Sequence, residues 1–203
     1  MFALAYAALS RLVETGVSEA RLSQILPLFA QAGLALTRGQ YLDMAFEKVP
    51  VVSVEDYLGM VGGKSAGLIG LSMRVGAIIA GLGDEMVRRY AELGYNLGLA
   101  FQIRDDILGI WGDAVAIGKS VRTDIVSRKK SLPVLYGLAV SDELREIYGQ
   151  SELSDADVMR CVEILDACGA RDFAVEHENV YFERVVRGLD GLGAVPGVAL
   201  ETM

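Results

Sequence analysis

Two adjacent carboxylates interrupt the apolar segment 101–111. Asp105 and Asp106 stand at positions where a buried helix would carry leucine or alanine, and burying an unpaired carboxylate is costly. Gln102 precedes them by three and four residues, so on a helix the three polar side chains converge. We therefore expect a cationic partner at this pair of acids.

A charge-rich loop follows, over residues 112–128, and two lysines come directly after it. It contains Gly118-Lys119 and Asp124, and it leads into Lys129 and Lys130. Acids and lysines around such a loop suit a polyanion held through Mg²⁺, which keeps water ligands and bridges to phosphate oxygens. Lysines would supply the remaining positive charge. Taken alone, the same loop would favour a solvated, salt-bridged surface, and the acidic pair inside an apolar helix shifts the interpretation toward a binding site.

Two other places carry similar chemistry. Gln40 and Asp43 share one face of a predicted helix, and Lys64 stands just before the apolar run 66–82. A lysine there either extends outward to solvent or points into a polar cavity. Neither place would indicate a functional site by itself.

Composition narrows the class of protein. The 203 residues are 52% hydrophobic, which predicts one folded domain, residues 1–203, and the net charge of −8 argues against a nucleic-acid partner. One histidine and two cysteines seven residues apart predict neither a zinc site nor a disulfide framework, so we expect a cytoplasmic protein. Arg74 and four glycines in the run 66–82 favour a buried helix of a bundle, not an integral membrane span.

The elements that must position these residues are helices. Apolar spacing predicts an all-α chain with Ser18 and Ser53 as helix starts, and no run alternates with period two. The predicted helices cover residues 1–15, 17–46, 53 onward, 84–108, 131 onward, 154–168 and 170–192. No capping residue precedes the first helix, so we expect the chain to lack an upstream part, although a native start in mid-pattern is the alternative.

The motifs, taken in order, resemble the trans-prenyltransferase family, the isoprenyl diphosphate synthases. They read GQYLD at 39–43, KSAGL at 64–68, FQIRDDILGIWGD at 101–113 and GKSVRTDIVSRKKSLPVL at 118–135. The resemblance implies an isoprenoid-synthase-type helical bundle around a central cavity. It also implies Mg²⁺-dependent condensation of an allylic diphosphate with isopentenyl diphosphate, giving a longer all-trans isoprenyl diphosphate. Family members are usually dimers, so a homodimer of the full-length protein is expected.

The resemblance also implies roles for individual residues. Asp105 and Asp106 match the first two acids of the family's second aspartate-rich motif and would hold Mg²⁺, with Lys64 and Lys119 as further catalytic residues. The implied substrate-binding residues are Lys64, Ser65, Gln102, Lys119, Lys129, Gln40, Asp43 and Phe101.

Two departures from the family pattern stand out. Gly109 replaces the third acid of the motif, and no first aspartate-rich motif followed by arginines occurs in the 203 residues. We therefore expect the carboxy-terminal two-thirds of a synthase, lacking the N-terminal helices, inactive alone and with apolar faces exposed. A non-catalytic partner of an active synthase is the alternative. A terpene cyclase is disfavoured because its Asn/Asp-Ser-Glu metal motif is absent.

Overall fold

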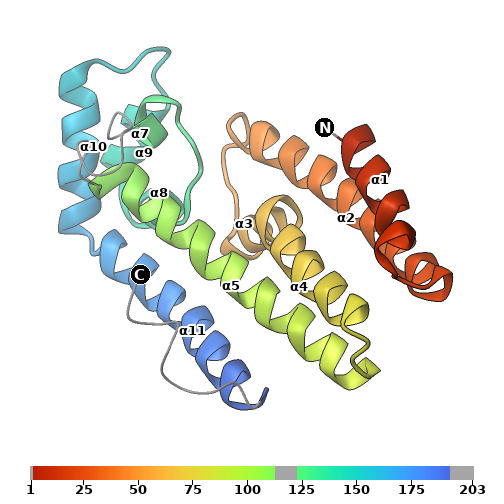
Figure 1. The fold of residues 1–203 in the computed structure, drawn as a ribbon. Coiled ribbons are helices and arrows are strands. Elements are labelled where there is room, and N and C mark those ends of the chain that lie inside the picture. Colours follow the sequence, from red (N-terminus) through yellow and green to blue (C-terminus); the bar gives the residue numbers. More distant parts are fainter. Residues whose placement is uncertain (1, 113–122, 193–203) are drawn as a thin grey trace.

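A computed structural model describes residues 2–112 and 123–192, and every regular element in these ranges is a helix (Figure 1). The elements are α1 (Phe2–Ser10), η1 (Arg11–Thr15), α2 (Glu19–Phe46), α3 (Val54–Val61), η2 (Gly62–Ala66), α4 (Gly67–Ile79), α5 (Asp84–Trp111), α7 (Thr123–Val126), α8 (Leu132–Val140), α9 (Asp142–Tyr148), α10 (Asp155–Ala167) and α11 (Ala170–Asp190). The all-α prediction is confirmed.

Several helix boundaries follow from local chemistry that the sequence displays. The Ser18 side chain accepts a hydrogen bond from the backbone N–H of Arg21, and Ser53 forms a capping box with Asp56. Gly16 ends the first helical stretch with φ of 90°, a conformation that glycine adopts without strain. These starts and stops agree with the predicted ones. The helix α9 was not predicted, and α7 lies within the stretch 112–128 that was predicted as a loop.

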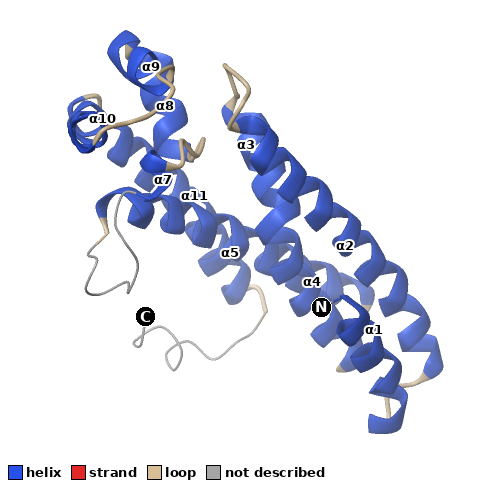
Figure 2. Cartoon of the chain, turned by 90° about the horizontal axis from the view of Figure 1, so that it is seen from above, coloured by secondary structure: helices blue, strands red, loops and turns tan. Residues whose placement is uncertain are grey.

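The long helices form a layer in which α2, α4, α5 and α11 lie side by side, with α1 against α2 (Figure 1). Glycines let α4 and α5 approach closely: a Cβ atom on Gly94 of α5 would lie 2.9 Å from Gly70 Cα of α4. At the carboxyl end of α5 the shorter helices α7 to α10 gather, and Figure 2 shows the same arrangement from above. This end of α5 carries the acidic pair.

The core divides into three clusters. The first surrounds Tyr57, Ile103 and Leu132 where α3, α5 and α8 meet, and it lies beside the acidic pair. The second joins α5, α7, α8, α9 and α10, and the third lies near the other end of α5, between α2 and α4. The candidate site is therefore built against packed apolar side chains.

The run 66–82 is less buried than predicted. It forms α4, in which Gly70, Ala77 and Ile78 are buried while Arg74 is exposed. The prediction of a buried helix is wrong for the remaining face, because α4 packs on α2 and α5 through only part of its circumference. In the described ranges, no helix is long and apolar enough to cross a membrane.

The expected exposure of apolar faces is also seen, most clearly on α2. Tyr41 follows Leu34 by seven residues and Met44 follows Tyr41 by three, spacings that share one helix face, and all three side chains are largely exposed. They form an apolar stripe along one side of the helix.

Candidate active site

Asp106 is the centre of the site and is completely buried on α5. Its Oδ2 atom accepts hydrogen bonds from the Tyr57 hydroxyl at 2.7 Å and from the Leu132 backbone N–H at 3.3 Å. Its Oδ1 atom accepts from Lys129 Nζ at 2.7 Å and from Gln102 Nε2 at 3.3 Å. Four donors therefore compensate the loss of water around one buried carboxylate.

The donors come from elements far apart in sequence. Tyr57 lies on α3, Lys129 lies between α7 and α8, and Leu132 opens α8. The N–H groups in the first turn of a helix have no intrahelical partner and favour a negative charge. Asp106 accepts a hydrogen bond from one of these N–H groups, that of Leu132 on α8. Its two carboxylate oxygens therefore connect α5 to α3, to the segment before α8 and to the start of α8.

Asp105 differs sharply from its neighbour. It is exposed, and its carboxylate accepts a long hydrogen bond from Gln102 Nε2 at 3.3 Å. Among the described residues, the expected cationic side chain is Lys129 at Asp106, and no lysine or arginine forms an ion pair with Asp105. The physical reason is the 100° turn per residue, which points adjacent side chains in different directions.

Gln102 links the acidic pair to the π-helical turn η2. Its Oε1 atom accepts a hydrogen bond from the Ser65 hydroxyl at 2.6 Å, and its amide group donates to Asp105 and Asp106. The predicted convergence of Gln102, Asp105 and Asp106 is confirmed. Such single π-turns inside helices are frequently found at functional sites.

Lys64, the residue before Ser65, forms a separate pair with Asp43. The Lys64 Nζ and Asp43 Oδ2 atoms are 2.5 Å apart, and both side chains are partly buried. The structure thus answers the question left by the sequence: this lysine points to a polar partner on α2. That partner is Asp43, and Lys64 forms no ion pair with Asp105 or Asp106.

Lys129 is held between two acids. Besides Asp106, it contacts Asp124 Oδ2 at 3.3 Å. Burial alone would lower the pKa of Lys129, but the two carboxylates outweigh burial and hold that pKa above its usual range. Burial raises the pKa of Asp124, with Asp106 acting in the same direction and Lys129 opposing it.

The other predicted residues are not brought into this network. Gln40 is exposed on α2, and Phe101 is 61% exposed on α5. Lys119 lies outside the described residues, as do all residues of the charge-rich loop from 113 to 122. Within 2–112 and 123–192, no group of three or more histidine, cysteine, aspartate or glutamate side chains could hold a metal ion.

Tyr57 is the residue that the sequence did not reveal. It is fully buried, and burial together with the adjacent Asp106 raises its pKa well above the usual value. A tyrosine four residues after a capping serine reads as an ordinary core residue. The contact with Asp106 spans 49 residues, so no local pattern could predict it.

The donor set fits a magnesium ion at Asp105 better than at Asp106. Mg²⁺ prefers carboxylate oxygens and commonly keeps several waters when only one or two carboxylates bind it. Asp105 offers an exposed carboxylate, whereas both Asp106 oxygens already accept two hydrogen bonds each. Asp105 would therefore be the ligand, and Asp106 would hold the Lys129 ammonium beside it.

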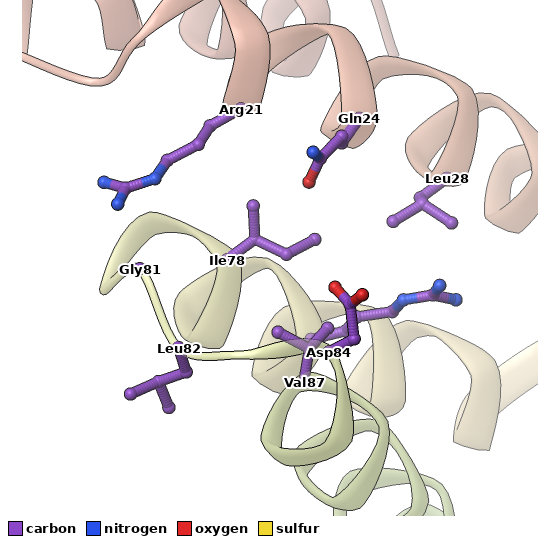
Figure 3. Close-up of a pocket in the computed structure, with 9 residues that line it drawn as sticks. Arg21, Gln24, Leu28, Ile78, Gly81, Leu82, Asp84 and Val87 are labelled. Carbon is purple, nitrogen blue, oxygen red and sulfur yellow. The ribbon is translucent and has the colours of Figure 1, made fainter.

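A hollow lies near the amino-terminal end of α5, roughly 30 Å from the site at 1.5 Å per helical residue. Its volume is about 500 Å³, and its lining includes Arg21, Asp84 and Val87 (Figure 3). Arg21 donates to the Ile79 carbonyl oxygen at 3.1 Å and so satisfies the end of α4. None of the predicted site residues lines this hollow.

The fold and the site together define an all-α protein in which a buried aspartate–lysine pair supports an exposed aspartate. A family model described as polyprenyl synthetase matches residues 1–165. Geranylfarnesyl diphosphate synthase from Aeropyrum pernix is 38% identical over 191 residues, covering 93% of this chain and 59% of that protein. Geranylgeranyl diphosphate synthase from Sulfolobus acidocaldarius is 30% identical over 194 residues, covering 92% and 58%.

Solved structures agree. A polyprenyl synthetase from Streptomyces coelicolor A3(2) superposes with a TM-score of 0.83 at 30% identity, covering 93% of this chain and 59% of that one. The chain belongs to the polyprenyl synthetase family. It spans a little under 60% of the length of the curated relatives named above.

Proposed function

We propose that this chain forms the diphosphate-binding part of an isoprenyl diphosphate synthase. The reaction would join an allylic diphosphate to isopentenyl diphosphate and give a longer all-trans isoprenyl diphosphate. The observation that carries the proposal is the difference in environment between the two adjacent acids: Asp105 is exposed, and Asp106 is buried against Lys129. Family membership supports the assignment of the reaction.

Each residue then has a defined task. Asp105 would hold Mg²⁺, which would supply positive charge to the departing diphosphate. Lys129 would add fixed positive charge where negative charge develops, a favourable arrangement because it needs no rearrangement during the reaction. The resemblance to the family implies diphosphate binding by Lys119 as well. Lys64, paired with Asp43, would place a further ammonium near Ser65 and Gln102.

The 203 residues contain one aspartate-rich motif, so we propose that they bind diphosphate more readily than they turn substrate over. Metal and orientation effects each contribute several kcal/mol to such reactions, and one carboxylate motif supplies only part of them. The exposed apolar stripe of Leu34, Tyr41 and Met44 supports a further proposal, that α2 packs against a second copy in a homodimer.

The decisive experiment is calorimetric titration of the purified protein with inorganic pyrophosphate, with and without Mg²⁺. We expect Mg²⁺-dependent binding that weakens at least about tenfold in Asp105→Asn, because loss of 1.4 kcal/mol already gives that factor. Asp190→Asn, an exposed acid at the end of α11, should bind as the unaltered protein does. A pyrophosphate affinity that changes neither when Mg²⁺ is left out nor in Asp105→Asn would overturn the proposal and favour a non-catalytic partner of an active synthase.

A further inference from the structure

The Tyr57 hydroxyl has no part in the function proposed above, although it touches the central carboxylate. The side chain is 0% exposed, and its oxygen lies 2.7 Å from Asp106 Oδ2. Its ring packs in the first core cluster with residues such as Val61 and Ile103. Phenylalanine would fill the same apolar space, so the hydroxyl needs an explanation of its own, because burying it without a partner is unfavourable.

The two oxygens of Asp106 face different sets of donors. Oδ2 is held by Tyr57 and by the Leu132 N–H, and Oδ1 faces Lys129 and Gln102. Fixing Oδ2 therefore fixes the rotation of the carboxylate and the position of Oδ1. Lys129 is bound to Oδ1 at 2.7 Å while its side chain keeps 22% of its surface exposed. The hydroxyl thus acts on the lysine through one intervening group.

We propose that Tyr57 is a positioning residue: through Asp106 it holds the Lys129 ammonium at the diphosphate site. The role of Lys129 toward diphosphate rests on the proposed function, whereas the coupling from Tyr57 to Lys129 stands on the contacts alone. Tyr57 lies on α3 and Lys129 precedes α8. The hydroxyl therefore makes the position of the lysine depend on how α3 packs against α5.

A matched control exists in the same protein. The Tyr148 hydroxyl is also buried, but it has no hydrogen-bond partner among the described residues. Tyr57→Phe and Tyr148→Phe therefore remove the same atom, in one case from a network and in the other from apolar surroundings. A general effect of losing a buried hydroxyl would appear in both variants.

The first measurement is the affinity for inorganic pyrophosphate with Mg²⁺ in a double-mutant cycle. Tyr57→Phe should weaken binding about tenfold, near the effect of one hydrogen bond to a charged group. In a Lys129→Met background the same change should weaken binding less than about twofold, since the lysine it positions is gone. Equal effects in both backgrounds would refute the proposal, and Tyr148→Phe should leave the affinity unchanged.

The second measurement does not depend on diphosphate. The rate at which an amine-reactive ester acylates Lys129 can be followed by peptide mass spectrometry, with exposed Lys48 as the internal reference. Release of Asp106 should raise the relative rate at Lys129 several-fold in Tyr57→Phe and not in Tyr148→Phe. An unchanged rate would refute the coupling. If the unaltered protein fails to bind pyrophosphate while this rate rises, the proposed function falls and the coupling stands.

Discussion

Lys129 Nζ lies 2.7 Å from Asp106 Oδ1, in a pair whose acidic side chain is 1% exposed and whose basic side chain is 22% exposed. Asp124 approaches the same ammonium at 3.3 Å. The pair joins α5 to the segment before α8, 23 residues later in the chain. Such a buried pair is costly to form, but removing one partner is costlier because the other is left uncompensated.

We therefore expect Asp106→Asn to be strongly destabilising. The change leaves Lys129 with Asp124 as its remaining acid and puts an amide donor near the Tyr57, Gln102 and Leu132 donors. The free energy of unfolding should fall by about 3 kcal/mol, as for other broken buried pairs. Asp105→Asn should change it by less than about 0.5 kcal/mol, since exposed acids contribute little. Urea unfolding followed by helical circular dichroism measures both, and equal losses would contradict the asymmetry.

The same cluster predicts the behaviour of stability at alkaline pH. The pKa of Tyr57 is raised by burial and by Asp106, and the pKa of Lys129 is raised by its two acids despite burial. Both groups keep their protons in the folded state at pH values where the unfolded chain begins to lose them. Their contribution to stability is thus complete below pH 10.0, the ordinary value for tyrosine, and is lost as pH rises above it.

Urea unfolding between pH 8 and pH 11 checks this sign, and the stability should fall across the upper part of that range. Tyr57→Phe should flatten the fall only in part, because Lys129 remains. Burial also raises the pKa of Tyr148, so that residue adds to the fall in the same direction. A stability that rises with pH in this range would contradict the protonation states assigned to the cluster.

What the sequence could predict was local. The convergence of Gln102 with the acidic pair follows from helical geometry, and the start of α3 follows from Ser53 and its capping box. The asymmetry of the pair was not predictable, because the partners of Asp106 come from residues 57, 129 and 132. Sequence patterns report neighbours within a turn or two, and these contacts depend on how separate helices pack.

Ser53→Ala should weaken the short helix that carries Tyr57. Its hydroxyl accepts from the Asp56 N–H at 3.0 Å, and the Asp56 carboxylate in turn accepts from the Ser53 N–H at 3.3 Å. With only eight residues in α3, this cap satisfies a large share of its unpaired backbone groups. The expected loss is about 1 kcal/mol in the free energy of unfolding. Hydrogen exchange along α3 should also accelerate, and unchanged exchange there would argue that packing alone holds the helix.

Two glycine-to-alanine changes should have opposite signs. A Cβ atom on Gly39 would lie 2.5 Å from the Lys64 backbone N and 2.9 Å from the Met60 carbonyl O, so α2 would have to move away from η2. Such overpacking costs about 1–3 kcal/mol, and the displacement should also disturb the Lys64–Asp43 pair.

A Cβ atom on Gly76 would meet nothing within 4 Å, and this position lies inside the exposed face of α4. Gly76→Ala should therefore stabilise the protein by about 0.5–1 kcal/mol, because alanine restricts the unfolded chain and favours the helix. Urea unfolding of the two variants side by side tests both values. If Gly39→Ala were as stable as Gly76→Ala, the backbones of α2 and η2 would be farther apart than the structure shows. The position of Lys64 on η2 would then be less closely fixed by α2.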